Sequence, residues 1–340
     1  SGDAKSRVPV SMTTRPGRNL IVEGLGVSSV SISISRMWCG RCQSASQNVL
    51  TAAQPALTEW SRRRAKLTDQ LNKTAWITGA SSGIGEALTK AFVASGGYAI
   101  LSGRNVGELQ RVATETGATE RCLILPFDTV DYASLADKVA AAIAFQGHID
   151  VLVNNAGISQ RSPALDTDLS VYQRIVDVDL LAPIALTQAL LSHMVSRGSG
   201  QIVMISSVAG KAGVPMRTAY CAAKHGLIGY ADALRSEVAG QGVKVLVVAP
   251  GSVKTNVSRN ALNADGSVRG ISDAAIDNGI DPNEVASLIW EAVRTGKREI
   301  VIAEGMEASI PVLRAQDPEK LFDMVEAMVA AGYAQKISAQ

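Results

Sequence analysis

The sequence predicts an α/β protein built on a single doubly wound parallel sheet of about seven strands, with helices on both faces. Two observations predict this fold. From residue 73 onward, short apolar runs alternate with longer amphipathic segments, which is typical of parallel strands covered on both faces. A glycine-rich turn at 79–85 joins the first apolar run to the first amphipathic segment, as in βα units with right-handed crossovers.

The apolar runs and the segments between them define the elements in chain order. The runs predict strands at 75–78, 98–101, 122–127, 149–153, 201–205, 243–249 and 299–302. The intervening periodic segments predict helices at 84–95, 106–115, 132–145, 168–196, 218–239 and 282–295. In the tail, apolar residues recur at helical spacing over 317–331. We expect that last helix to pack in a core or an interface.

Composition and charge restrict the class of protein. The 340 residues carry a formal net charge of +2, which does not indicate a nucleic-acid-binding surface. No run of about 18 apolar residues occurs, so we expect no transmembrane segment. The four cysteines are too few for a disulfide framework, which favours a reducing compartment. We therefore expect a cytoplasmic protein and no metal site.

Residues 1–72 differ in composition from the remainder of the chain. They contain ten Lys and Arg residues against four Asp and Glu residues and are rich in serine. We expect a poorly ordered extension, with a helix at 55–73, and the alternative is an organelle-targeting segment. Cys39 and Cys42 form a Cys-x-x-Cys pair. A redox site needs a strand and a helix around such a pair, and a zinc site needs a second pair, so we assign it neither function.

The glycine-rich turn predicts a dinucleotide site in a Rossmann-type fold. Glycines let the backbone approach a pyrophosphate, whose charge is met by the free N–H groups of the following helix. Its position between a strand and a helix favours dinucleotide binding over an ordinary turn. The candidate residues in this turn are Gly79, Ser81, Ser82, Gly83, Ile84 and Gly85.

The end of the second strand indicates which dinucleotide is bound. A site for NAD usually has an acidic residue there, which binds the ribose hydroxyls. This chain instead has Ser102-Gly103-Arg104-Asn105. Arg104 can pair with a 2′-phosphate through charge-assisted hydrogen bonds, and Ser81 or Ser82 can add a hydroxyl. We therefore expect NADP(H) rather than NAD(H).

Tyr220 and Lys224 form a candidate proton-transfer pair. Their spacing of four residues puts them on one face of the helix expected at 218–239. An ammonium group beside a phenol favours the phenolate, which makes the hydroxyl useful as an acid or base. Ser207, thirteen residues upstream of Tyr220, can hold a substrate oxygen. A Tyr-x3-Lys pair alone is common, so its meaning depends on the surrounding motifs.

Together these motifs resemble the classical short-chain dehydrogenases/reductases. The resemblance covers 73 to about 255 and rests on the glycine turn, Ser207, Tyr220-x3-Lys224, and the segments Asn154-Asn155-Ala156-Gly157 and Pro250-Gly251. The segments 154–159 and 206–225 are most similar to the branch that includes 11β-hydroxysteroid-dehydrogenase-like and related carbonyl reductases. The resemblance implies hydride transfer between a nicotinamide and a ketone, aldehyde or secondary alcohol.

The resemblance also implies roles for individual residues. Tyr220 is the general acid or base, Lys224 assists it and binds the nicotinamide ribose, and Ser207 orients the substrate oxygen. Further contacts to the cofactor are implied for Asp128, Thr129, Asn155, Ala156, Gly157, Val253 and Thr255.

One residue departs from the pattern of the family. Asp179 occupies the position where the family usually has a catalytic asparagine in the long helix. An ionised carboxylate has no amide donor, and burial would raise its pKa or require a partner. We include Asp179 among the catalytic candidates and expect an altered proton relay. The alternative function is an NADP-binding sensor or scaffold with weak catalysis.

The remaining expectations concern organisation and substrate. We expect an extension at 1–72, a catalytic domain at 73–305 and a helical tail at 306–340. We expect the substrate to be a small carbonyl or alcohol compound, enclosed by 159–165, 208–216 and the loop 257–279, which can act as a lid. The resemblance implies a homodimer or homotetramer.

Overall fold

A computed structural model describes residues 11–14, 19–23, 32–33 and 72–338. The chain divides into two units, Ser1–Arg63 and Arg64–Gln340. In the first unit, β1 (Ser11–Thr14), β2 (Asn19–Glu23) and β3 (Ile32–Ser33) pair antiparallel in the order β1-β2-β3. These strands differ from the poorly ordered extension expected at 1–72. The Cys39–Cys42 pair lies outside the described residues, as does the helix expected at 55–73 except for its last two residues.

The second unit contains the predicted parallel sheet. Its seven strands follow the order β10-β9-β8-β7-β4-β5-β6, and all neighbouring strands are parallel. The strands are β4 (Thr74–Thr78), β5 (Tyr98–Ser102), β6 (Cys122–Ile124), β7 (Val151–Asn154), β8 (Gly200–Ile205), β9 (Val243–Pro250) and β10 (Glu299–Ile302). The chain order reverses between β4 and β7. Ligands of doubly wound sheets bind at such a reversal, beyond the carboxyl ends of the strands.

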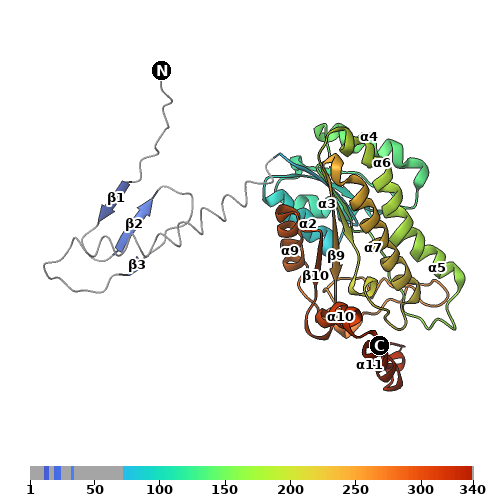
Figure 1. Cartoon of the computed structure of the whole chain (residues 1–340). Helices are drawn as coiled ribbons and strands as arrows, with labels where there is room; N and C mark the ends of the chain where they lie inside the picture. Colours follow the sequence, from blue (N-terminus) through green and yellow to red (C-terminus); the bar gives the residue numbers. More distant parts are fainter. Residues whose placement is uncertain (1–10, 15–18, 24–31, 34–71, 339–340) are drawn as a thin grey trace. The chain divides into compact units, whose positions relative to one another are not determined.

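Helices cover both faces of this sheet (Figure 1). The main helices are α2 (Gly83–Ala94), α3 (Val106–Glu115), α4 (Leu135–Gln146), α5 (Leu169–Val176), α6 (Ala182–Ser196), α7 (Thr218–Val238) and α9 (Pro282–Thr295). Shorter or C-terminal helices are α8 (Ala274–Asp277), α10 (Gly305–Gln316), α11 (Pro318–Ala330) and α12 (Tyr333–Ser338). The predicted doubly wound fold is thereby confirmed.

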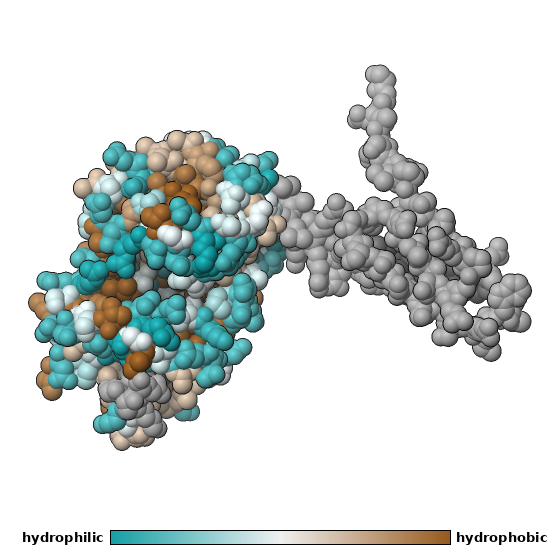
Figure 2. Space-filling model, turned by 180° about the vertical axis from the view of Figure 1, so that it is seen from behind, coloured by the Kyte–Doolittle hydropathy of each residue, from teal (hydrophilic) through white to brown (hydrophobic). Residues whose placement is uncertain are grey.

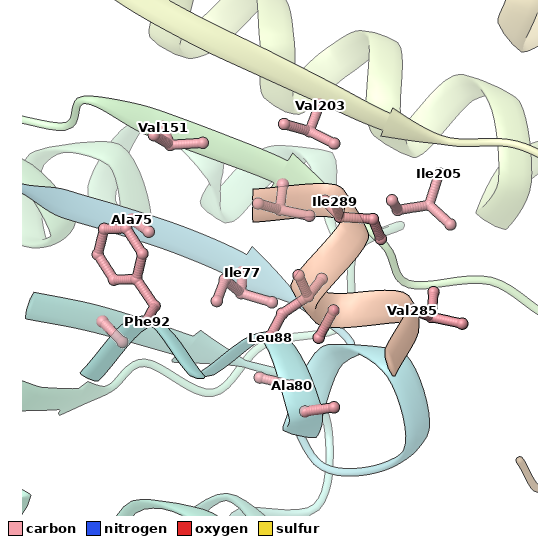
Figure 3. Close-up of a cluster of buried hydrophobic side chains, with 14 of the residues drawn as sticks. Ala75, Ile77, Ala80, Leu88, Phe92, Val151, Val203, Ile205, Val285 and Ile289 are labelled. Atoms are coloured by element: carbon pink, nitrogen blue, oxygen red, sulfur yellow. The ribbon is translucent and has the colours of Figure 1, made fainter. Parts of the chain in front are cut away.

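Alternation along the strands produces two separate cores. In β4, Ala75 and Ile77 join a cluster that includes Leu88 and Phe92 of α2, as Figure 3 shows. Trp76, between them, belongs to the cluster on the opposite face with α4, α6 and α7. Successive residues of a strand point to opposite faces, and both faces are covered here. Continuous apolar runs are therefore the pattern that this sheet requires.

Two elements differ from the sequence expectation because of proline. The strand expected at 122–127 ends at Ile124, and Pro126 in that stretch has no N–H to donate. The helix expected at 168–196 contains a π-helical turn at Asp177–Leu181 between α5 and α6. Pro183 cannot donate the hydrogen bond that an α-helix would direct to the carbonyl of Asp179, which explains the wider turn. Asp179 lies inside this turn.

The helical stretch Leu169–Ser196 is long and apolar enough to cross a membrane by length and composition alone. This differs from the expectation of no such segment, which was based on uninterrupted apolar runs. Leu186, Leu190 and Met194 of the stretch are buried in a core cluster of the sheet. A buried core helix passes the same test, so the finding is weak evidence for a membrane span.

The surface carries both polar areas and hydrophobic patches, as Figure 2 shows for one face. The tail contributes several exposed apolar side chains, including Met306 and Val312 of α10 and Phe322 of α11. Leu321 of α11 is buried, at 4% exposure. The expected tail helix therefore packs through only part of its apolar face.

Candidate active site

A cavity of about 710 Å³ lies at the carboxyl ends of the central strands. Its lining includes all the predicted site residues except Gly85. These are Gly79, Ser81, Ser82, Gly83, Ile84, Arg104, Asp128, Thr129, Asn155, Ala156, Gly157, Asp179, Ser207, Tyr220, Lys224, Val253 and Thr255. The structure therefore brings together residues that lie as far apart as Gly79 and Thr255 in the sequence.

The glycine turn has the backbone geometry that a phosphate-binding loop needs. Gly79 and Gly83 have φ values of +64° and +58°, which residues with a Cβ rarely adopt. A Cβ on Gly85 would lie 2.2 Å from the carbonyl oxygen of Gly79. Gly85 therefore allows α2 to pack closely on the turn. Ser82 at the N-cap of α2 makes no side-chain cap hydrogen bond, so the helix N-terminus can stabilise an anion.

The hydroxyl of Thr78 joins the ends of β4 and β7. It accepts hydrogen bonds from the backbone N–H groups of Asn155 at 3.0 Å and Ala156 at 3.1 Å, and donates to the carbonyl of Val153 at 3.3 Å. The side-chain amide of Asn155 donates to the carbonyl of Thr78 at 2.9 Å. These bonds hold the glycine turn against the segment after β7. Thr78 was not among the predicted site residues.

Lys224 is a buried cation at the base of the cavity, with 4% exposure. Its Nζ donates to the carbonyl of Ile205 at 3.0 Å and lies 3.1 Å from Oδ2 of Asp179. It also lies 5.6 Å from the centroid of the Tyr220 ring. Burial disfavours the ammonium, but Asp179 and Tyr220 together outweigh this and raise the pKa of Lys224.

Asp179 is fully buried, at 0% exposure. Its Oδ1 accepts a hydrogen bond from the N–H of Ile158 at 2.8 Å. Its Oδ2 has no well-aligned hydrogen bond, so its contact with Lys224 is an ion pair of imperfect geometry. Burial raises the pKa of the Asp179 carboxyl, and Lys224 and the Ile158 N–H only partly offset that increase. The asparagine position is therefore occupied by an acid paired with the lysine.

Ser207 lies at the end of β8, on the same cavity as Tyr220. Its Oγ accepts from the N–H of Ala209 at 3.1 Å and donates to the carbonyl of Pro250 at 3.3 Å. The latter bond is long, so the hydroxyl can exchange it for a substrate oxygen. The neighbouring Ser206 donates to the carbonyl of Lys224 at 3.0 Å, which ties β8 to α7.

Arg104 lies on the cavity wall after β5. Its side chain is 64% exposed, and its Nη1 is 3.9 Å from Oδ2 of Asp128, whose side chain is 39% exposed. An exposed ion pair at this distance contributes little to stability, so the guanidinium of Arg104 remains available to an anionic group. Asn105 accepts a hydrogen bond from the N–H of Glu108 as the N-cap of α3. No carboxylate follows β5 within 102–105.

The substrate end of the cavity differs in part from the expectation. Residues of 257–279 contribute to the wall, but none of 159–165 or 208–216 does. Residues 159–162 are buried instead, and Arg161 among them pairs with Asp273 through two contacts of 2.6 Å. Additional residues that line the cavity and were not predicted include Arg174, Val178 and Asn256. The available signal was the spacing of four residues between Arg174 and Val178, which puts both on one face of the helix expected at 168–196.

Asp273 also connects the segment 257–279 to the start of α7. Its carboxylate binds Arg217 at 3.3 Å and contacts Arg269, in addition to Arg161. Arg217 precedes Tyr220 by three residues. Burial, the largest single effect, would raise the pKa of the Asp273 carboxyl. The hydrogen bonds and charges of the arginines together outweigh burial and lower that pKa. The charged cluster holds this segment beside the helix that carries Tyr220.

Comparison with known proteins gives consistent matches. The family model described as short chain dehydrogenase matches 73–266. "Dehydrogenase/reductase SDR family member 7B" of Danio rerio is 42% identical over 249 residues, covering 71% of this chain and 80% of that protein. A short-chain dehydrogenase structure from Streptomyces avermitilis has 28% identity and a TM-score of 0.65, covering 76% of this chain and 98% of that one. A metagenomic short-chain oxidoreductase, solved in complex with NADP, has 28% identity and a TM-score of 0.58, covering 70% of this chain and 100% of that one.

The Thr78 hydroxyl can be tested by substitution. We expect Thr78→Val to lower the free energy of unfolding by about 1–3 kcal/mol, because two backbone N–H groups lose their acceptor. Thr78→Ser keeps the hydroxyl and loses one methyl group, about 0.8 kcal/mol, so we expect it to lose less stability than Thr78→Val. Urea unfolding measures both. Equal losses in the two variants would contradict the role assigned to the hydroxyl.

Proposed function

The chain belongs to the short-chain dehydrogenase family, and on that premise we propose that it is an NADP(H)-dependent reductase of ketones or aldehydes, reversible as an alcohol dehydrogenase. The observation that carries the proposal is that Ser207, Tyr220 and Lys224 line one cavity together with the glycine turn. A proton donor, an oxygen-binding hydroxyl and a dinucleotide loop are the parts that carbonyl reduction requires.

The residues of the cavity fit a nicotinamide dinucleotide. Gly79 and Gly83 have left-handed backbone conformations and no Cβ, and a Cβ on Gly79 would lie 2.9 Å from Nδ2 of Asn155. We assign the turn and the N-terminus of α2 to the pyrophosphate. Asp128 and Thr129 would lie at the adenine end, and Asn155 to Gly157, Val253 and Thr255 along the ribose and nicotinamide. When bound, the cofactor supplies or accepts the hydride.

Side chains of this protein carry out the proton transfer. In reduction, the hydroxyls of Ser207 and Tyr220 donate hydrogen bonds to the carbonyl oxygen of the substrate. Tyr220 then gives its proton to that oxygen and becomes a phenolate. The ammonium of Lys224, 5.6 Å from the ring centroid, stabilises the negative charge. In oxidation the phenolate takes the proton back.

The preference for NADP(H) rests on Arg104. It is an exposed cation on the cavity wall, and the segment 102–105 at the end of β5 has no carboxylate to bind the ribose hydroxyls. A guanidinium suits a phosphate monoester because it can donate two parallel hydrogen bonds. We also propose kinship with the 11β-hydroxysteroid-dehydrogenase-like and related carbonyl reductases, based on 154–159 and 206–225. Val257, Leu262 and Val268 on the wall suit a substrate with an apolar body.

The alternative of a sensor or scaffold is less favoured. It was motivated by Asp179, which could have disrupted the catalytic residues. Lys224 nevertheless remains bonded to Ile205 and close to the Tyr220 ring. The three groups needed for proton transfer are therefore in place.

Replacement of the general acid tests the activity itself. We expect Tyr220→Phe to lower kcat for NADPH oxidation by a ketone about 10²–10⁴-fold, because it removes the hydroxyl that donates the proton. NADPH oxidation against a panel of ketones and aldehydes is followed by absorbance. Tyr230→Phe is the matched control, since Tyr230 lies on the same helix and packs in the core. Equal rates for wild type and Tyr220→Phe on every substrate would contradict the proposal that the protein is a carbonyl reductase.

Substitution of Arg104 tests the proposed preference for NADP(H) over NAD(H). We expect Arg104→Ala to raise KM for NADPH about 10–100-fold, because a charge-assisted hydrogen bond contributes about 1.5–3 kcal/mol. KM for NADH should remain unchanged or decrease. The control is Arg298→Ala, an exposed arginine before β10 at the amino end of the sheet. A proportional loss with both cofactors would exclude a 2′-phosphate contact.

Substitution of Asp179 tests the expectation of an altered proton relay. We expect Asp179→Asn to keep kcat or to raise it up to about tenfold, a barrier change of at most about 1.4 kcal/mol. The amide supplies the N–H donor that the family uses, while the carbonyl of Ile205 still accepts a hydrogen bond from the Lys224 ammonium. Asp177→Asn, in the same π-helical turn, is the matched control. A large decrease of kcat in Asp179→Asn alone would show that the carboxylate itself is required.

A further inference from the structure

A carboxylate of the C-terminal tail binds the segment that follows β9. Glu307 lies in the first turn of α10. Its Oε2 accepts a hydrogen bond from the backbone N–H of Ser252 at 2.6 Å, and its Oε1 accepts one from the Ser252 hydroxyl at 2.9 Å. Hydrogen bonds to a charged acceptor are about twice as strong as neutral ones. Glu307 belongs to a region beyond 73–266, the part matched by the family model.

The contact depends on a close approach that only glycine permits. A Cβ on Gly251 would lie 2.3 Å from Oε2 of Glu307 and 2.9 Å from Cβ of Ala303. The N–H of Gly251 donates to the carbonyl of Ile302 at 2.9 Å. The end of β9, the end of β10 and the start of α10 are therefore packed together at this point.

Ser252 transmits this contact to the cavity. Its carbonyl accepts from the N–H of Ile280 at 3.0 Å, and the carbonyl of Ile280 accepts from the N–H of Lys254 at 3.0 Å. The residue between them, Val253, is 3% exposed and lines the cavity. Two residues further on, the methyl carbon of Thr255 lies 2.9 Å from the position of a Cβ on Gly83. Segment 252–255 thus reaches from Glu307 to the glycine turn.

We propose that Glu307 is a positioning residue for the cofactor, acting through Ser252 on Val253 and Thr255. This inference rests on the proposed function, in which those two residues contact the dinucleotide. Glu307 accepts hydrogen bonds from the backbone N–H and from the hydroxyl of Ser252. These bonds fix the conformation of segment 252–255. The tail therefore contributes to cofactor affinity without touching the cofactor.

The test measures cofactor binding directly in the full chain. NADPH is titrated into wild type, Glu307→Ala and Glu307→Gln, and Kd is read from the nicotinamide fluorescence. We expect Glu307→Ala to raise Kd about tenfold, because two charge-assisted bonds that order the segment are lost. Glu307→Gln keeps one acceptor oxygen and should raise Kd less. At saturating NADPH, kcat and KM for the ketone should stay within about twofold of wild type.

Two controls separate positioning from general damage to the tail. Glu304→Ala changes an exposed acid at the N-cap of α10, which makes no side-chain cap hydrogen bond, and should leave Kd unchanged. Ser252→Ala removes only the hydroxyl contact, so its Kd should lie between those of wild type and Glu307→Ala. This variant also serves if Glu307→Ala fails to fold.

Three results would overturn the inference. Wild-type Kd in both Glu307→Ala and Ser252→Ala would show that the contact does not influence the cofactor. An equal increase of Kd in Glu304→Ala would assign the effect to the tail as a whole. Absence of NADPH binding by wild type would overturn the proposed function as well, whereas normal wild-type binding with unaffected variants would overturn the positioning role alone.

Discussion

The candidate site depends on the junction between β4 and β7, where one hydroxyl holds two strand ends together. Thr78 bonds the backbone of Val153, Asn155 and Ala156. This is the reversal point of the sheet order, where a crevice forms because successive connections leave towards opposite faces. Close contact at this point leaves no room for a Cβ on Gly79. The glycine turn and the segment after β7 can therefore form one continuous wall of the cavity.

The second constraint is the burial of a charge. Lys224 must keep its ammonium in a nearly dry position, and an isolated ion there would be costly. The carbonyl of Ile205 and the carboxylate of Asp179 meet this requirement from two different elements. The π-helical turn at Asp177–Leu181 carries Asp179 into contact with both Ile158 and Lys224. Local deformation of a long helix thus contributes directly to the arrangement of the candidate catalytic residues.

Much of the fold and of the cavity was predictable because the signals are local. Apolar runs marked the strands, and the glycine turn and the Tyr220–Lys224 spacing marked residues that share one cavity. The features that were not predicted depend on contacts between residues distant in sequence. Arg161 pairs with Asp273 across 112 positions and Ser252 with Glu307 across 55, and no periodicity connects such partners. Pro126 and Pro183 were visible, but their effects on β6 and on the long helix required the surrounding hydrogen bonds.

The central claim is that this cavity supports hydride transfer between a nicotinamide and a carbonyl carbon. NADPH deuterated at C4 of the dihydronicotinamide tests it most directly, with the alcohol product analysed by mass spectrometry. The account predicts that the wild-type protein, with a ketone that it turns over, transfers deuterium to the carbinol carbon without exchange with water. Alcohol formed without deuterium from either C4 position, or no transfer to any ketone or aldehyde tested, would contradict it.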